Sequence, residues 1–350
     1  MKKSLLLFLL LLSFIYTNMI FIKNTPAQTN QDIGLISATL AEVPQEDKQK
    51  DAKSDVDVDK KSEQKPEQKP DQNKLPIEEK KEDDFEGFKG MERAYDGPLP
   101  WQDNSKFQEA VQKQETPVLM AAYRASLPDP IMAEGYNIGL AAQQLAGTVV
   151  KPNETFSQNQ TLGPYIESKG YKAGPTYSGN QLITTVGGGV CKIASMLYNV
   201  VTFCDLKVVT RSAHSMTVPY VPPGQDATVY YGCRDFCFLN DSGVPLLIWA
   251  QKEGDTLYMA FYGHKKAPPI VWHHKIIKEN KLWTERKYNP ALPEGQENIV
   301  TQGQDGLAVR SWVTIEEPEG ELVVKNKGIS YYNPSPRVVE YGPLSKPAKN

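Results

Sequence analysis

The feature that most restricts the fold of this 350-residue chain is a charged stretch near its start that cannot build a core. Residues 45–84 hold no aromatic side chain and consist largely of Lys, Glu, Asp, Gln and Pro, and the tetrapeptide EQKP occurs twice in succession. Such a segment cannot bury enough apolar surface to offset the entropy lost on ordering. We therefore expect residues 28–100 to be a disordered tether, with the folded part beyond it.

The residues before the tether have the pattern of an export signal. Two lysines follow Met1, residues 5–15 are almost purely apolar, and the small residues Thr-Pro-Ala at 25–27 offer a cleavage point. The apolar stretch can also be extended to Ile22, which approaches the roughly 20 residues that a spanning helix needs. Residues 1–27 are thus expected to be a cleaved signal peptide or an N-terminal membrane anchor. Either way, the rest of the chain would be extracytoplasmic, secreted or attached to the outer face of the membrane.

The remainder of the chain has the composition of a folded protein without a basic surface. The net charge of −3 gives no field that would attract nucleic acid, so no nucleic-acid partner is expected. All five tryptophans and all four cysteines lie after residue 100. We divide this part into a domain at residues 101–255 and a C-terminal module at residues 256–350.

The periodicity predicts an α+β fold. Ile138, Ala141, Ala142 and Leu145 give one helix an apolar face, and a second apolar-periodic run from Ile193 to Cys204 predicts a central helix that Asp205 ends. A helix followed by strands in order is typical of α+β folds, here with the central helix packed on an antiparallel sheet. After residue 252 all runs are short and β-like, which predicts a small all-β, antiparallel module. Residues 156–164 are interpreted as a polar loop.

The strands expected are residues 117–123, 206–210, 228–231, 236–239, 246–250, 258–262, 270–273, 307–315, 322–325 and 338–341.

A glycine-rich loop opens the central helix and places a cysteine at its start. Gly187, Gly188 and Gly189 allow the backbone to approach a neighbour closely, and Cys191 follows them. The unpaired N–H groups at a helix start favour negative charge, which lowers the pKa of a thiol held there. Cys191 is therefore a candidate nucleophile, and the three glycines are candidate substrate-binding residues.

A cysteine nucleophile needs a base and a group that orients this base. His214 lies beyond the helix and one strand, far enough along the chain to fold back beside Cys191. Asp226 follows the turn Pro222-Pro223-Gly224, which has the pattern of a type II turn. Asp235, one strand later, is the competing carboxylate. The order cysteine, histidine, aspartate is also that of papain-like and transglutaminase-like enzymes.

Structural explanations compete with the catalytic one. Cys191 can be a small buried residue, and the glycines can serve tight packing of helix against strand. Cys233 and Cys237 on one extended strand could form a disulfide only across a bend. Cys204 is expected in the core.

No cofactor or metal is expected. Adjacent strand residues point to opposite faces, so His273 and His274 cannot readily share a metal ion. The glycines at 187–189 lack the lysine placement of a phosphate-binding loop, and no dinucleotide-binding fingerprint is present.

Residues 118–252 carry an ordered set of motifs that resembles the VanW family. The motifs are Asn137-Ile138, Pro152-x-Glu154-x-Phe156-Ser157-x-Asn159, Leu162-Gly163-Pro164, Gly187-Gly188-Gly189-Val190-Cys191, Leu197-Tyr198-Asn199, His214-Ser215, Pro222-Pro223-Gly224-x-Asp226 and the strand with Asp235. The C-terminal stretch with Gly306 and Tyr332-Asn333-Pro334 resembles a G-five-type β module.

The resemblance implies an extracytoplasmic Gram-positive cell-wall protein associated with glycopeptide (vancomycin) resistance, whose ligand is peptidoglycan, its precursors or the stem peptide. In the enzymatic reading, Cys191, His214 and Asp226 catalyse thiol-dependent acyl transfer or amide hydrolysis. The substrate pocket would include Ser157 and Asn159, together with Tyr198, Asn199 and Asp235. The sequence departs from the family at Lys192, where glutamine is common; if that glutamine donates to an oxyanion, Lys192 would have to replace it.

Two further readings stay open. In one, the protein is a non-catalytic cell-wall binding or scaffold protein, and the glycine-rich helix start recognises an anionic group such as a stem-peptide carboxylate. In the other, the whole motif is structural, with Cys191 buried and His214 hydrogen-bonded in the core.

Overall fold

A computed structural model describes residues 92–127, 132–178 and 181–343 of the chain. The expected signal or anchor at residues 1–27 and the tether up to residue 91 lie outside the described residues.

Ordered structure begins before residue 101, where the tether was expected to end. The backbone N–H of Tyr95 donates to the carbonyl of Ala122 at 2.8 Å, and that of Trp272 donates to the carbonyl of Glu92 at 2.8 Å. Leu99 is buried with 4% of its surface exposed. The few apolar residues after the charged stretch therefore already join the core.

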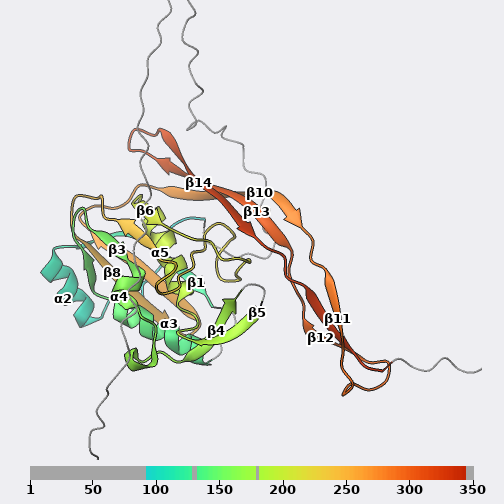
Figure 1. Ribbon diagram of the computed structural model, residues 1–350. Helices are drawn as coiled ribbons and strands as arrows, with labels where there is room; N and C mark the ends of the chain where they lie inside the picture. The colour runs from blue at the N-terminus through green and yellow to red at the C-terminus, as the bar shows by residue number, and fades with distance from the viewer. Residues whose placement is uncertain (1–91, 128–131, 179–180, 344–350) are drawn as a thin grey trace, which may run out of the picture. The chain divides into compact units, whose positions relative to one another are not determined.

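The first part of the fold is built on a four-stranded antiparallel sheet with the order β1-β9-β8-β2 (Figure 1). Its strands are β1 (Val118–Ser126), β2 (Thr148–Val150), β8 (Leu246–Glu253) and β9 (Thr256–Gly263). Three helices contact it: α2 (Ser105–Gln114) and α3 (Met132–Leu145) contact β8, and α5 (Cys191–Phe203) contacts β1 and β9. Because β9 pairs with β1 and β8, the expected boundary at 255/256 falls inside this sheet.

Helix α5 lies at the centre of the core because apolar residues recur along it at helical spacing. Ile193, Leu197 and Val200 are fully buried and share one cluster with Tyr123 and Phe261. Burial of each such side chain contributes roughly 1.5–3 kcal/mol. The helix ends at Phe203, and Asp205 just beyond it has a positive φ of 56°.

The segment before α5 is more ordered than the sequence suggested. Residues 156–164, interpreted as a loop, form part of β3 (Thr155–Ser157) and the short helix α4 (Gln158–Leu162). Ser157 caps this helix, since its Oγ accepts a hydrogen bond from the N–H of Gln160 at 3.1 Å. Residues 228–231, expected as a strand, form only an isolated bridge between Tyr230 and Arg234.

The remaining elements of this part are short. A three-stranded sheet has the order β3-β7-β6, with β6 at Lys207–Thr210 and β7 at Cys237–Leu239. A hairpin of β4 (Ala173–Ser178) and β5 (Gln181–Val186) precedes the glycine turn and follows the 3₁₀ turn η1 (Glu167–Lys169).

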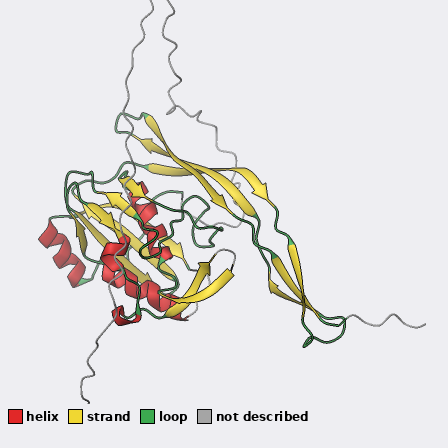
Figure 2. Cartoon of the chain, viewed as in Figure 1, coloured by secondary structure: helices red, strands yellow, loops and turns green. Residues whose placement is uncertain are grey.

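After Phe203 the described residues contain only strands and loops (Figure 2). One sheet has the order β10-β13-β14, with β10 at Ile270–Asn280, β13 at Gly306–Glu316 and β14 at Leu322–Tyr332. The other has the order β11-β15-β12, with β11 at Thr284–Tyr288, β12 at Glu297–Thr301 and β15 at Arg337–Tyr341.

The expectation of a purely antiparallel C-terminal module is wrong at one pair. β11 and β15 run parallel, with Thr284 opposite Arg337 and Tyr288 opposite Tyr341. A parallel pair needs a long connection rather than a hairpin, and here β12, β13 and β14 lie between the two strands in the chain.

In residues 92–127, 132–178 and 181–343, no helix is long and apolar enough to span a bilayer.

Candidate active site around Cys191

Cys191 is the first residue of α5, directly after the glycine turn. The N-cap residue Val190 offers no side-chain cap, and the first helical turn contains no acidic residue. Among the described residues, the backbone N–H of Cys191 has no hydrogen-bond acceptor. The helix start therefore places a thiol next to a backbone N–H that has no acceptor among the described residues.

His214 and Asp226 meet in the loops that follow β6. Nδ1 of His214 lies 2.7 Å from Oδ2 of Asp226, and the same oxygen accepts the backbone N–H of His214 at 2.7 Å. Asp226 is fully buried and His214 has 8% of its surface exposed. Asp226, rather than Asp235, is therefore the carboxylate that contacts the imidazole.

The thiol of Cys191 also interacts with His214. Burial alone would raise the pKa of Cys191, but a hydrogen bond with His214 and the charge of its ring lower this pKa to about 7. Thr228 contributes as well, because its Oγ1 lies 3.4 Å from Sγ. The charge of His214 thus couples the thiol of Cys191 to the hydrogen-bonded pair of His214 and Asp226.

The pKa shifts of His214 and Asp226 both favour the charged form of the side chain. Burial alone would lower the pKa of His214, yet hydrogen bonds with Asp226 and Cys191 raise it to about 9. Burial would raise the pKa of Asp226, but His214 and Arg211 lower it to about 2. Between about pH 7 and pH 9 the site therefore favours a thiolate beside an imidazolium, held by an ionised carboxylate.

A polar row along α5 fixes the segment that carries Asp226. Asn199 donates from Nδ2 to the carbonyl of Gln225 at 2.9 Å, and Oγ of Ser195 accepts the N–H of Ala227 at 2.9 Å. Cys191 continues the row, since its Sγ accepts the N–H of Val229 at 3.5 Å. Residues four apart face the same side of a helix, so these three side chains follow the segment 225–229 one turn at a time.

The turn before Asp226 sets its direction. The N–H of Gln225 donates to the carbonyl of Pro222 at 3.0 Å, and Gly224 has a φ of 98°, which favours glycine. Arg211 adds a second support, because its Nη2 lies 3.1 Å from Oδ1 of Asp226. Sequence reasoning missed Arg211 and Ser195; the spacing of 191, 195 and 199 in an otherwise apolar helix was the available signal.

Ser157, Asn159 and Asp235, expected in the pocket, form a hydrogen-bonded cluster of their own. Oγ of Ser157 donates to Oδ2 of Asp235 at 2.5 Å, and the N–H of Asn159 donates to Oδ1 of Asp235 at 3.0 Å. Tyr165 donates to Asn159 and accepts from Gln158, whose Nε2 also donates to the carbonyl of Val190 at 3.2 Å. The cluster therefore supports the helix start from the side of α4.

The three glycines approach protein atoms closely. A β-carbon on Gly187 would lie 2.5 Å from Cβ of Tyr165, and one on Gly188 would overlap the carbonyl of Gly174 in β4. A β-carbon on Gly189 would lie 2.8 Å from Cγ of Glu134. These contacts match the packing alternative of the sequence analysis, and they place the turn tightly against β4 and α3.

Tyr198 and Asn199 point inward instead of lining an open space. Tyr198 is 3% exposed, and its ring packs edge-on against Trp272 at 5.6 Å and carries Arg211 over its face at 5.0 Å. Asn199 is fully buried on the polar row of α5. Both residues contact parts that hold Asp226: Tyr198 packs against Arg211, and Asn199 binds the carbonyl of Gln225.

Lys192 has a partner away from the thiol. Its Nζ forms an ion pair with Oε1 of Glu134 in α3 and lies 4.9 Å from the centre of the Tyr220 ring. This ion pair therefore joins α5 to α3 through Lys192.

The other cysteines and the paired histidines lie outside this arrangement. All four cysteines are free thiols, and Cys204 is buried, so that burial raises its pKa. The rings of His273 and His274 stack on different tryptophans, Trp312 and Trp272. Within the described residues, no group of three or more potential ligands is placed to hold a metal ion.

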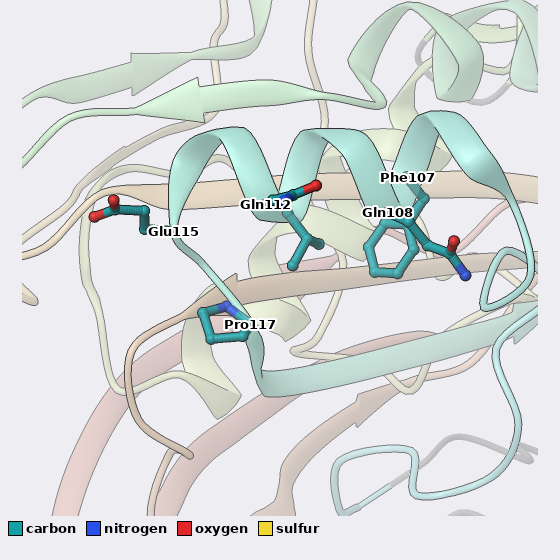
Figure 3. A pocket seen from close by; sticks show the side chains of 6 residues that line it. Phe107, Gln108, Gln112, Glu115 and Pro117 are labelled. Carbon is teal, nitrogen blue, oxygen red and sulfur yellow. The ribbon is translucent and has the colours of Figure 1, made fainter.

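A surface pocket of about 480 Å³ lies on α2 (Figure 3). It is lined by Phe107, Gln108, Val111, Gln112, Glu115 and Pro117. It shares no residue with the site around Cys191.

Comparison with protein families gives two consecutive matches. Residues 133–262 match the family described as VanW like protein, and residues 276–344 match the G5 domain. The first match contains Cys191, His214 and Asp226.

Two curated proteins are similar over the same region. An uncharacterized protein of Bacillus subtilis, YoaR, is 43% identical over 130 residues, which are 37% of this chain and 43% of YoaR. The vancomycin B-type resistance protein VanW of Enterococcus faecalis is 29% identical over 136 residues, which are 37% of this chain and 50% of that protein. The match thus spans half or less of the length of these relatives.

Two solved structures are similar to the C-terminal part. The G5 domain of an IgA1 protease is 26% identical, covers 23% of this chain and 98% of its own, and has a TM-score of 0.16. The G5 domain of HP0197 is 15% identical, covers 21% of this chain and 97% of its own, and has a TM-score of 0.13.

Proposed function

The chain carries a VanW-like domain followed by a G5 domain, and from this premise we propose that it is an extracytoplasmic cell-envelope protein that acts on peptidoglycan or its precursors. The reaction proposed is a cysteine-dependent acyl transfer or amide hydrolysis on the stem peptide. One observation carries the proposal: Nδ1 of the buried His214 lies 2.7 Å from Oδ2 of Asp226, and His214 lowers the pKa of the thiol of Cys191 at the start of α5.

In the proposed reaction, each side chain has one task. The Cys191 thiolate attacks an amide carbonyl carbon, a C–S bond forms, and the carbonyl electron pair moves to oxygen. The free N–H of Cys191 donates to this oxyanion. The His214 imidazolium gives its proton to the leaving amine as the C–N bond breaks, which leaves a thioester on Cys191.

The second half of the reaction releases the acyl group. Water, or an acceptor amine, attacks the thioester while neutral His214 takes its proton, and the thiolate leaves. Hydrolysis and acyl transfer differ only in the acceptor. Asp226 stays ionised throughout and keeps the ring of His214 in one orientation.

The location and domain organisation are part of the same proposal. Residues 1–27 would act as signal or membrane anchor and the charged segment as a tether into the wall. The VanW-like domain would extend through β9, because β9 pairs with β1 and β8. The relative named for vancomycin resistance supports an envelope setting.

A second candidate is recognition without chemistry. It is favoured by the open N–H at the start of α5 and by the absence of acidic residues in its first turn, which together suit an anionic group such as a stem-peptide carboxylate.

Cys191→Ser separates the two candidates. The purified protein is incubated with muropeptides, and the products and any covalent adduct are followed by mass spectrometry, with Cys233→Ser as control because Cys233 is an exposed thiol outside the site. The enzyme proposal expects turnover and an acyl adduct on Cys191 in the wild type and in Cys233→Ser, and neither in Cys191→Ser. Binding that is equal in all three proteins, without turnover or adduct in any, would favour recognition.

A further inference from the structure

Asp226 receives hydrogen bonds from both parts of the folded chain. Its Oδ2 faces His214, and its Oδ1 accepts from Nη2 of Arg211 at 3.1 Å and from the hydroxyl of Tyr332 at 2.5 Å. Tyr332 ends β14, within the match to the G5 domain. It is 106 positions from Asp226 in the chain and has only 2% of its surface exposed.

The end of β14 also contacts the loops that carry Asp226 and His214. The hydroxyl of Tyr332 accepts the N–H of Gly224 at 2.6 Å, and Oγ of Ser330 accepts from Nη1 of Arg211 at 2.9 Å. The N–H of Asn333 donates to the carbonyl of Ser215, the residue after His214, at 2.7 Å. Both catalytic loops are therefore tied to the end of β14.

The turn before Asp226 packs closely against β13. A β-carbon on Gly224 would overlap Oγ of Ser311 in β13, so the turn before Asp226 lies directly on the C-terminal sheet. Glycine is thus required there by its positive φ and by the contact.

Tyr332 helps to fix the orientation of the Asp226 carboxylate, because it donates to Oδ1 while His214 occupies Oδ2. A carboxylate held at one oxygen can still rotate, whereas donors on both oxygens fix its plane. Burial and the charge of Asp226 raise the pKa of Tyr332, so the phenol stays protonated and remains a donor. Arg211 alone would leave Oδ1 with a single side-chain partner.

We propose that Tyr332 is a positioning residue for the Cys191 site, through which the C-terminal β module completes an arrangement that the VanW-like domain does not hold by itself. The inference rests on the proposed function, since it assigns a role in keeping Asp226, and through it His214, aligned with the thiol.

The titratable groups around the site are few. Asp226 is faced by Arg211, His214, Tyr198 and Tyr332, and Cys191 is faced by His214 and Tyr165. Arg211 and the buried tyrosines keep one protonation state near neutral pH, so a change in the titration of Cys191 reports on His214 and Asp226.

The test is the pH dependence of Cys191 alkylation by iodoacetamide in the full chain, read by peptide mass spectrometry. In Tyr332→Phe the ring still fills its space, but Arg211 is left as the one side-chain donor to Oδ1, so the carboxylate is held less firmly beside His214 and the thiolate loses support. We expect the midpoint to rise by about one pH unit, roughly a tenfold loss of thiolate at pH 7. Tyr331→Phe is the matched control, because Tyr331 is 68% exposed on the same strand.

The outcomes separate this inference from the proposed function. A wild-type midpoint near the ordinary thiol value of about 8.5 would contradict the proposed function itself. A wild-type midpoint near 7 that is unchanged in Tyr332→Phe would overturn only the role of Tyr332. If Tyr332→Phe does not fold, Ser330→Ala tests the second link from β14, because it releases Nη1 of Arg211. A raised midpoint supports the positioning of Asp226 by the C-terminal β module, and an unchanged one overturns it.

Discussion

Nδ1 of His214 and Oδ2 of Asp226 lie 2.7 Å apart in a buried setting, and the backbone N–H of His214 donates to the same oxygen. The two contacts fix both the loop and the ring, because one carboxylate oxygen holds the main chain and the imidazole of a single residue. With Nδ1 engaged by Asp226, the other ring nitrogen is the one left for the thiol of Cys191. The order of carboxylate, imidazole and thiolate follows from this geometry.

Asp226→Asn should lower the free energy of unfolding by about 3 kcal/mol, because Arg211 and His214 lose the only carboxylate between them while remaining buried. Denaturant unfolding should show a lower midpoint with the same slope. Asp255→Asn is the control, because Asp255 is exposed in the turn between β8 and β9 and its loss should cost less than about 0.5 kcal/mol. Equal stabilities of the two variants would argue against a buried charge network at Asp226.

Gly188→Ala should destabilise the protein by about 1–3 kcal/mol, because its β-carbon overlaps the carbonyl of Gly174 and the turn can only move by displacing the start of α5. Gly139→Ala is the matched control within α3, where the nearest atom lies 3.9 Å from the added carbon. That change should be neutral or gain up to about 1 kcal/mol from helix propensity. If the Gly188 variant unfolds at the same temperature as the wild type, the conclusion that the glycine turn packs tightly against Gly174 is contradicted.

Sequence patterns predicted several local elements around Cys191 because these elements carry local signals. The apolar run after Cys191 predicted a helix, and the glycines before it marked a close approach. Proline and glycine before Asp226 predicted the turn that the chain has there. The loop interpretation of residues 156–164 was wrong. The segment is polar and offers few apolar positions that would mark a helix, but Ser157 caps α4 and stabilises its start.

The choice between Asp226 and Asp235 could not be made from the sequence. Both follow turns or strands at plausible distances, and what separates them is the contact of Ser195 and Asn199 with segment 225–227. The motif Tyr332-Asn333-Pro334 pointed to the C-terminal module and not to the site, because the contact of Tyr332 with Asp226 depends on β14 reaching a loop 106 positions earlier in the chain.

In Cys191→Ser, stability should fall as the pH rises from about 6.5 to about 9. The contact with Asp226 keeps the pKa of His214 above its unfolded value of about 6.5, so its contribution is complete below that value and is lost as the pH rises through the folded pKa. We expect a loss on the order of 1–2 kcal/mol, measured by urea unfolding across this range.

The matched comparison for that experiment is Cys191→Ser combined with His214→Gln. Lys327, whose burial lowers its pKa to about 8, titrates in both proteins and cancels in the difference. The decline should be present in the single variant and absent in the double variant. The same slope in both proteins would show that His214 is not the group responsible.

The most direct test of the central claim, that His214 holds Cys191 as a thiolate, is the alkylation rate of Cys191 as a function of pH in the wild type and in His214→Gln. The thiol of the urea-unfolded protein serves as reference. The wild-type rate should rise with a midpoint near pH 7, and the variant should shift up toward the ordinary thiol value of about 8.5. Wild type and variant titrating together, at the value of the unfolded chain, would contradict the account.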